Sequence, residues 1–259
     1  MKSLKLNNKQ FFTYKNDLPD SLILGKEIGI DTETTGLSLV RDRLCLIQIS
    51  SGDDNCHLVK FDVDFFRKRT PPKNLIKLLS DKEVSKIFHF ARFDLAIIKK
   101  FLDVSCENIF CTKIASKLVR TYTDKHGLKD LCKELLGIDL NKSQQSSDWS
   151  SEGLSNNQIN YAASDVIYLN KLKEILFEML KREERLDLAN KVFTFLNTRV
   201  DLDIFLSGEE WVQTNFLKHS LKYDFSLIEG AMGLFDGLGA TSYSSTANVA
   251  KLLDTPIIF

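Results

Sequence analysis

Ile28-Gly-Ile-Asp31-Thr-Glu33-Thr-Thr-Gly36-Leu37 is the stretch on which the fold and the chemistry of this chain depend. It ends an apolar run, 22–30, with two carboxylates separated by a single residue. Side chains at positions i and i+2 of a strand leave the same face, so Asp31 and Glu33 point the same way. Two like charges this close repel each other unless a cation lies between them. The natural occupant is a divalent ion with oxygen ligands, Mg2+ or Mn2+. The competing interpretation is a strand that ends in a solvated turn at 34–36.

The composition is that of an ordinary globular protein. The 259 residues are 43% hydrophobic and 27% charged, which suits one large domain or a domain with an appendage. Lysine plus arginine and aspartate plus glutamate are equal at 35 each, so any contact with nucleic acid has to come from a local patch. The sequence shows neither an apolar signal core nor an apolar run of membrane-spanning length. We therefore expect a cytoplasmic protein without a membrane partner.

The cysteines are odd in number, lie mostly in apolar segments and form no Cys-x-x-Cys pair. This pattern predicts reduced cysteines in the core, and neither a disulfide framework nor a zinc site. They are Cys45, Cys56, Cys106, Cys111 and Cys132.

The first half of the chain has the pattern of an α/β protein. Strands that first follow one another and then alternate with helices predict a sheet with an antiparallel portion. The predicted elements are strands at 43–50, 56–61 and 84–90 and helices at 74–79 and 92–102.

Beyond residue 110 the pattern becomes helical. Lys113, Lys117 and Arg120 share one helix face, either as guides for a phosphate backbone or as an ordinary solvated face. In the polar loop 141–150, Trp149 either stacks on a base or pins the loop to the core.

Two predicted helices end this part of the chain. Ser155 as N-cap and Gln158 at the third helical position form a capping box, which opens a long helix to about Leu180. An amphipathic helix at 186–196 then closes the domain near Asp203.

Two further acids complete a candidate site. Asp94 lies in the first turn of the helix after the fourth strand, where the helix dipole tolerates negative charge. Asp165 is expected in the middle of the long helix, with Tyr161 one turn earlier on the same face. An acid buried there is costly unless it is paired. Each signal is weak alone, but together they form a specific arrangement.

These motifs resemble the DEDD exonucleases of the tyrosine branch, and residues 20–204 resemble a short ribonuclease D. Asp31 and Glu33 match the first motif, Asp94 in His-Phe-Ala-Arg-Phe-Asp the second, and Tyr161 with Asp165 the third. The resemblance extends to Leu44-Cys-Leu-Ile-Gln-Ile-Ser50 and to the Ser-Asp-Trp-Ser loop. The histidine branch has a histidine five residues before the last aspartate, where this chain has Asn160.

The resemblance implies a ribonuclease H-like fold, with a five-stranded mixed sheet flanked by helices. It also implies two divalent metal ions ~4 Å apart, Mg2+ or Mn2+, that clamp the attacking and leaving oxygens of a phosphodiester. In this interpretation Asp31 bridges both ions, and Glu33 and Asp165 hold the ion that activates water. Asp94 acts in the outer shell of the second ion. Tyr161 orients the attacking water.

The expected function is a metal-dependent 3′→5′ exoribonuclease that releases 5′-mononucleotides from structured RNA such as tRNA precursors. A close alternative has the same chemistry on DNA or another single-stranded nucleic acid, because no residue is identified that reads the 2′-hydroxyl. A non-catalytic nucleic-acid-binding module is disfavoured by the intact set of four carboxylates with Tyr161.

From about Ser207 the sequence changes character. Segments 224–237 and 245–259 resemble an interior piece of cobyrinic acid a,c-diamide synthase, a P-loop ATP-dependent amidotransferase. The chain has no G-x-x-x-x-G-K-[ST] loop to bind phosphates, which excludes that activity.

We interpret residues 207–259 as a truncated piece of that α/β family joined to an exonuclease domain at 1–206. The alternative is an extension that packs on the nuclease. The tail carries strand-like segments at 225–230 and 256–259.

Overall fold

The computed structural model divides the chain into two compact units, Met1–Leu202 and Asp203–Phe259. In the second unit, helix α9 spans Thr246–Leu252, and Gln213 Nε2 donates to the Leu252 carbonyl at 2.9 Å. The strand-like segments predicted in the tail lie outside the described residues. The structure describes residues 2–6, 9–68, 70–140, 147–206, 213, 216–218, 220–222 and 246–253.

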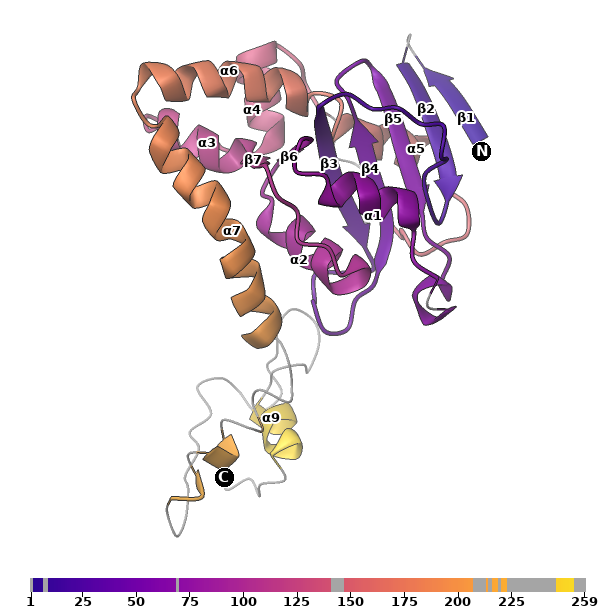
Figure 1. The fold of residues 1–259 in the computed structure, drawn as a ribbon, viewed down its shortest axis with the longest axis vertical. Coiled ribbons are helices and arrows are strands. Elements are labelled where there is room, and N and C mark those ends of the chain that lie inside the picture. Colours follow the sequence, from indigo (N-terminus) through magenta and orange to yellow (C-terminus); the bar gives the residue numbers. More distant parts are fainter. Residues whose placement is uncertain are drawn as a thin grey trace. The chain divides into compact units, whose positions relative to one another are not determined.

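The first unit is built on one mixed sheet of seven strands in the order β1-β2-β5-β4-β3-β6-β7 (Figure 1). Strand β3 pairs antiparallel with β4 and parallel with β6, and β4 pairs antiparallel with β5. The mixed α/β sheet flanked by helices is confirmed, but the expected number of five strands is wrong. The strands are β1 Lys2–Leu6, β2 Lys9–Lys15, β3 Glu27–Thr34, β4 Leu44–Ser50, β5 Asn55–Lys60, β6 Ser85–Phe88 and β7 Ile109–Cys111.

The additional strands owe their conformation to tertiary pairing. Strand β2 pairs in parallel with β5, whose residues are distant in sequence (Gln10 opposite Asn55), and β1 then pairs antiparallel with β2. Strand β7 has three residues, too few for a periodic pattern, and lies parallel to β6. The core of the sheet is β4, in which every residue is buried. A strand covered on both faces reads as a continuous apolar run, as this one does.

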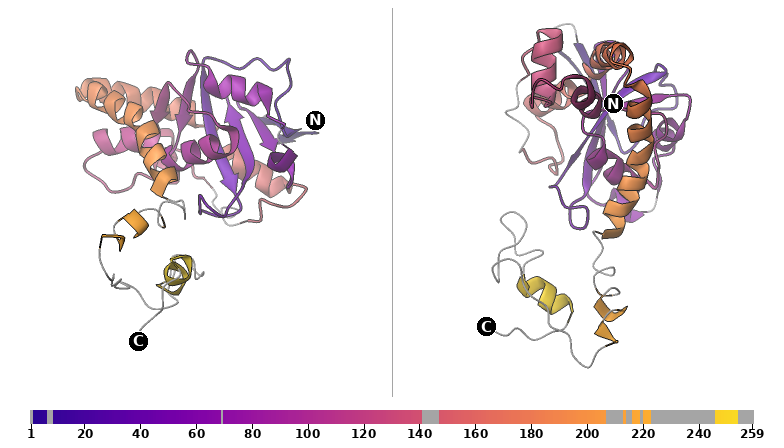
Figure 2. Two further views of the ribbon diagram at one scale, coloured as in Figure 1. Left: turned by 60° about the horizontal axis from the view of Figure 1, so that its bottom comes forward. Right: turned by 90° about the vertical axis from the view of Figure 1, so that its left-hand side faces the viewer.

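Helices cover both faces of the sheet (Figures 1 and 2). In Figure 1, α1 and α2 lie in front of the strands and α5 lies behind them. Helix α5 packs against β4 and β5, whereas α6 packs against β3 and β6. None of the described helices is long and apolar enough to span a membrane. The remaining elements are η1 Phe65–Lys68, α1 Lys73–Ser80, α2 Arg92–Leu102, α3 Thr112–Val119, α4 Leu128–Leu136, α5 Asn156–Ser164, α6 Leu169–Arg182 and α7 Leu186–Leu206.

The long helix predicted from Ser155 to Leu180 is in fact two helices. The predicted capping box is confirmed at the start of α5. However, α5 ends at Ser164, and a turn over 165–168 separates it from α6. The chain turns because the two helices pack on different pairs of strands. Asp165 is therefore the C-cap of α5, and its predicted place in mid-helix is wrong.

The predicted basic face does not exist at Arg120. Helix α3 ends at Val119, and the Arg120 side chain is fully buried. It forms an ion pair with Glu134 and donates to the Lys125 carbonyl at 2.7 Å. Neither of the two interpretations of this row holds for Arg120, because a buried guanidinium with its own carboxylate joins α3 to α4. The closing helix α7 also continues ten residues beyond its predicted end. All five cysteines are buried and free, as predicted.

Candidate active site

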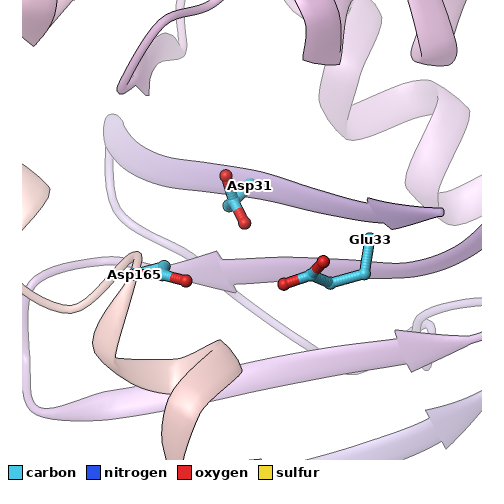
Figure 3. A group of neighbouring side chains, drawn as sticks. All are labelled: Asp31, Glu33 and Asp165. Carbon is cyan, nitrogen blue, oxygen red and sulfur yellow. The ribbon is translucent and has the colours of Figure 1, made fainter. Parts of the chain in front are cut away.

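Three of the predicted acids come together at one place. Asp31 and Glu33 project from β3, and Asp165 reaches them from the end of α5 (Figure 3). One oxygen from each carboxylate lies within 4.8 Å of the others. All three residues are half-buried. Carboxylate oxygens in this number and spacing are ligands that a hard divalent cation prefers, so the donor set fits such an ion.

Gly29 allows the close approach of Asp165 to β3. A Cβ at this position would lie 2.7 Å from the Val166 carbonyl oxygen and 3.1 Å from Leu169 Cβ. Real Cβ atoms do not come this close to a backbone carbonyl, so only glycine leaves room for the α5–α6 turn. Because Val166 follows Asp165 directly, the absence of a side chain at Gly29 sets how near Asp165 lies to Asp31.

Asp94 lies in the first turn of α2, as predicted, but outside the group of three carboxylates. It is buried, and the hydroxyl of Thr32 donates to its Oδ1 at 2.6 Å. Burial raises the pKa of Asp94 to about 7, although the Thr32 hydrogen bond acts in the opposite direction. Thr32 sits between Asp31 and Glu33 with its side chain on the other face of the strand. Strand β3 thus presents acids on one face and supports Asp94 from the other.

The carboxylates raise each other's pKa. Burial and then the charges of Asp94, Asp165 and Glu33 raise the pKa of Asp31 well above its usual value. Burial, followed by the charges of Asp165 and Asp94, raises the pKa of Glu33 to about 9. The site in the metal-free protein therefore stores repulsion that a bound cation would relieve.

Gln48 supports Asp31 and was assigned no role from the sequence. It is fully buried in β4, directly opposite Asp31, and its Nε2 donates to Asp31 Oδ2 at 3.3 Å. A polar residue within the apolar run 44–50 is the signal that identifies it, because a buried amide needs a partner.

Tyr161 lies on α5 beside the carboxylates. Burial and the charge of Asp165 raise the pKa of its hydroxyl above the usual value. The phenol is therefore protonated at neutral pH and serves as a hydrogen-bond donor. The ring of Trp149 packs against the Tyr161 ring, with 6.0 Å between the centroids. Trp149 is only 3% exposed, so its side chain packs in the core, as the second of the two interpretations predicted.

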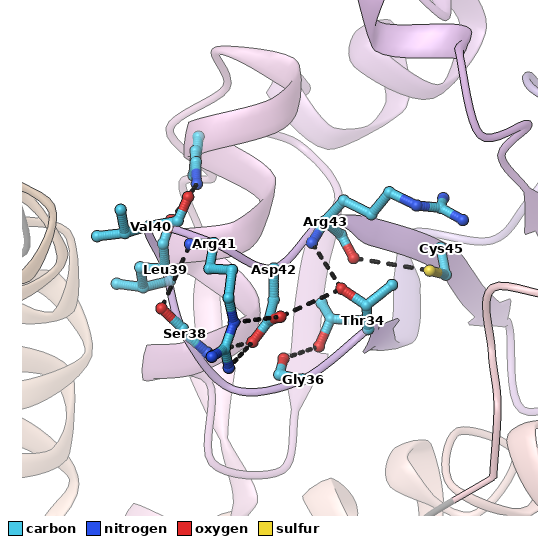
Figure 4. A network of polar contacts seen from close by, with 11 residues as sticks. Thr34, Gly36, Ser38, Leu39, Val40, Arg41, Asp42, Arg43 and Cys45 are labelled. Carbon is cyan, nitrogen blue, oxygen red and sulfur yellow. Dashed lines mark hydrogen bonds and ion pairs between the residues drawn. The ribbon is translucent and has the colours of Figure 1, made fainter. Parts of the chain in front are cut away.

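The turn between β3 and β4 is held by a buried carboxylate (Figure 4). Asp42 accepts hydrogen bonds from the Ser38 amide at 2.8 Å and from Arg41 Nε at 3.3 Å. A Cβ at Gly36 would collide with the Asp42 carboxylate, so a side chain there would displace Asp42 from these hydrogen bonds. The stretch therefore ends in a turn, as the competing interpretation predicted, and its two acids also lie in a group of carboxylates whose donors fit a divalent cation.

The stability of the metal-free protein should fall as pH rises. The pKa values of Asp31, Glu33 and Asp94 are raised in the folded state. Their contribution to the free energy of unfolding is therefore complete near pH 4, and it is lost as pH rises through the pKa of about 7 for Asp94 and of about 9 for Glu33. In EDTA at pH 8.5, we expect Asp31→Asn to raise Tm by at least about 3 °C. At pH 5 the gain should be smaller.

Thermal melts at both pH values, with EDTA and with Mg2+, measure this effect. The exposed acid Glu152 provides the control, since Glu152→Gln should give the same Tm difference from wild type at both pH values. A lower Tm for Asp31→Asn in EDTA at pH 8.5 would contradict the stored repulsion.

Comparison with known proteins assigns the family. A family model described as 3′–5′ exonuclease matches residues 13–181, which include every acid of the site. The chain belongs to this exonuclease family.

This 3′–5′ exonuclease matches some relatives over most of their length and others over less than half of it. The ribonuclease D of Gluconacetobacter diazotrophicus is 36% identical over 160 residues, 62% of this chain. The chain spans only 39% of that relative. The structure of Brucella melitensis NrnC with bound Mg2+ is 46% identical, with a TM-score of 0.69, and covers 75% of this chain and 93% of NrnC. A second NrnC structure, bound to pGG, is 42% identical with a TM-score of 0.69, covering 85% and 98%.

The C-terminal part of the exonuclease chain has a different relative. The cobyrinate a,c-diamide synthase of Synechocystis sp. is 55% identical over 62 residues, 23% of this chain and 13% of the synthase. The resemblance to a partial stretch of that enzyme is thereby confirmed.

Proposed function

We propose that this chain is a divalent-metal-dependent 3′→5′ exoribonuclease that releases 5′-mononucleotides from the 3′ end of short RNA. The observation that carries the proposal is the group of Asp31, Glu33 and Asp165, within 4.8 Å of one another and beside Tyr161. Membership of the 3′–5′ exonuclease family and similarity to NrnC support the proposal.

The substrate class follows from the two kinds of relative. The expectation of tRNA precursors rests on ribonuclease D, of which this chain spans 39%. NrnC, of which it covers 93–98%, was solved with pGG, a two-guanosine nucleotide with a 5′ phosphate. We therefore favour short 5′-phosphorylated oligoribonucleotides over structured RNA.

Asp31, Glu33 and Asp165 would hold the metal, and Asp94, whose charge acts on Asp31 and Glu33, would serve a second ion. We propose two ions, Mg2+ or Mn2+. When bound, they supply positive charge that stabilises the oxygens of the phosphodiester as it breaks. Gln48 keeps the Asp31 carboxylate in one orientation, and Thr32 does the same for Asp94. The protonated Tyr161 hydroxyl orients the attacking water by a hydrogen bond.

A comparison of substrates tests the proposal. The full chain is incubated with pGG, a 5′-phosphorylated RNA of about ten nucleotides, the DNA of the same sequence, and a tRNA with a 3′ extension, each with Mg2+, Mn2+ or EDTA. We expect mononucleotide release from the short RNAs, abolished by EDTA. Faster hydrolysis of the DNA would favour the DNA exonuclease. Faster trimming of the tRNA would restore the ribonuclease D-like substrate, and no release from any of them would contradict the proposal.

Tyr161→Phe should lower kcat for pGG by at least about tenfold, because it removes the hydroxyl that orients water. KM should change little, since the ring and its contact with Trp149 remain. Steady-state kinetics measure both constants. A wild-type kcat would make Tyr161 a packing residue only.

Deletion of residues 207–259 should leave kcat per folded molecule unchanged. Every acid of the site lies before residue 203, and we propose that residues 1–206 form the exonuclease domain and that the tail is a piece of another family. If strands of that piece lack their parent sheet, their edges promote aggregation, so the deletion should improve solubility. Kinetics and the soluble fraction after expression test this, and loss of most of the activity would show that the tail is a working part of the enzyme.

A further inference from the structure

The segment 148–150, which precedes α5, is held by side chains from three different places in the fold. Gln158 Nε2 on α5 donates to the Asp148 carbonyl at 3.0 Å, and Lys60 Nζ at the end of β5 donates to the Trp149 carbonyl at 2.6 Å. The third donor, Arg43 Nη2, lies 3.5 Å from the Ser150 carbonyl. Three successive backbone carbonyls thus each accept from a different donor. We call these three donors and the segment they hold the carbonyl clamp.

Lys60 is the buried member of the carbonyl clamp. It is 9% exposed, and burial lowers the pKa of its ammonium group. The charged groups around it are Arg43, Asp148 and Asp62, with the thiol of Cys45. A buried ammonium needs hydrogen-bond acceptors, and the Trp149 carbonyl is one that lies within hydrogen-bond distance. The bond therefore fixes the backbone at Trp149 relative to the sheet.

The Trp149 side chain carries this constraint to the active site. Its ring lies against the ring of Tyr161 at an angle of 38°. Its indole Nε1 has no hydrogen-bond partner among the residues that the structure describes. The position of the indole is thus set by packing and by the backbone that Lys60 holds. Tyr161 in turn lies one helical turn before Asp165, to which its hydroxyl is hydrogen-bonded.

We propose that Lys60 is a positioning residue for hydrolysis, which acts through Trp149 on the Tyr161 hydroxyl. The inference rests on the proposed function, because it requires that this hydroxyl orient the attacking water. The hydrogen bond of Lys60 goes to the Trp149 backbone and not to a carboxylate of the site. Its effect on the rate should depend entirely on the presence of the Tyr161 hydroxyl.

A double-mutant cycle with pGG as substrate tests the proposal. Lys60→Met removes the donor and keeps much of the side-chain volume. We expect kcat to fall about tenfold, in the range that small misplacements cost, while KM stays within about twofold. In the Tyr161→Phe background, Lys60→Met should lower kcat no further, because both changes act on one hydroxyl. An equal fall in both backgrounds, or a wild-type kcat for Lys60→Met, overturns the proposal.

Lys86 provides a matched control. Like Lys60, it is a buried lysine on a strand, burial lowers its pKa, and it donates to a backbone carbonyl, that of Asp81. That carbonyl lies in the turn after α1 and has no link to Tyr161. Lys86→Met should therefore keep the wild-type kcat. Thermal melts should show Lys60→Met no less stable than Lys86→Met, since replacing a buried charge by an apolar group is often neutral or stabilising.

The fluorescence of Trp149 reports the clamp independently of activity. The chain has two tryptophans, so in a Trp211→Phe background the emission comes from Trp149 alone. Adding Lys60→Met should shift this emission to the red and increase its quenching by acrylamide. Unchanged emission overturns the proposal. If Lys60→Met does not fold, Lys60→Gln, whose side chain is too short to reach the carbonyl, takes its place in both experiments. If the wild type hydrolyses nothing, the proposed function fails, and the emission still decides whether Lys60 fixes the indole.

Discussion

Asp31→Ala should reduce hydrolysis of pGG by about 10³-fold or more, at least the effect of removing one strong electrostatic contact to a transition state. Asp31 lies at the centre of the acidic group, since its carboxylate interacts with those of Glu33, Asp94 and Asp165. Its loss should weaken every metal position at once. The measurement is kcat/KM at saturating Mg2+, with isothermal titration of Mg2+ to separate lost binding from lost chemistry.

The Asp42 carboxylate gives the control for this experiment. It is buried and lies eleven residues further along the same β3–β4 hairpin, but it serves the turn and not the acidic group. Asp42→Ala should lower Tm and leave kcat per folded molecule close to wild type, because the group of three carboxylates is intact. Near-wild-type activity in Asp31→Ala would contradict the assignment of the metal ligands.

Gly29→Ala should lower both stability and activity, although it adds only a methyl group. The new Cβ would meet the Val166 carbonyl, which is backbone and cannot rotate away. Overpacking of this kind costs about 1–3 kcal/mol. Relief comes from moving the α5–α6 turn away from β3, and Asp165 moves with it. A displacement of about 1 Å can cost about 10²-fold in rate, so we expect kcat to fall by that order.

Gly25→Ala is the matched glycine control. A Cβ there would come no closer than 3.9 Å to Ser51, which is an ordinary contact. Its Tm and kcat should stay near wild type. Chemical denaturation measures the free energy of unfolding of both variants, and steady-state kinetics measure their kcat. A folded Gly29→Ala enzyme with unchanged kcat would show that Asp165 is not positioned by this close approach.

The sequence predicted the acids better than it predicted the elements that carry them. The placement of Asp31 and Glu33 on one face of a strand was predicted correctly, because side chains of a strand alternate with a period of two and the strand continues a strong apolar run. Tyr161 and Asp165 were paired correctly although their helix was not, because a spacing of four residues survives to the last turn of α5. The turn that follows Asp165 contains neither proline nor glycine, so no local signal marks it. The position of this turn is determined by tertiary packing, because α5 and α6 pack on different strands.

The supporting residues could not be predicted for a related reason. Lys60 looks like an ordinary lysine at the end of a strand, and Arg120 like one of a row of exposed cations. Their partners, the Trp149 carbonyl and Glu134, become neighbours only when distant segments pack together. Gln48 was the exception that offered a local signal, since an amide within a buried apolar strand needs an explanation.

The separation of α5 from α6 has a consequence for how this enzyme can evolve. The capping box fixes where α5 begins, and Asp165 ends it, so the ten-residue interval from Ser155 to Asp165 determines the direction in which the acid points. One residue inserted within that interval would rotate Asp165 by about 100° around the helix and remove it from the site. An insertion after α6, beyond Arg182, leaves Asp165 where it is. Functional homologues should therefore vary in length after α6 and hold α5 to a constant length.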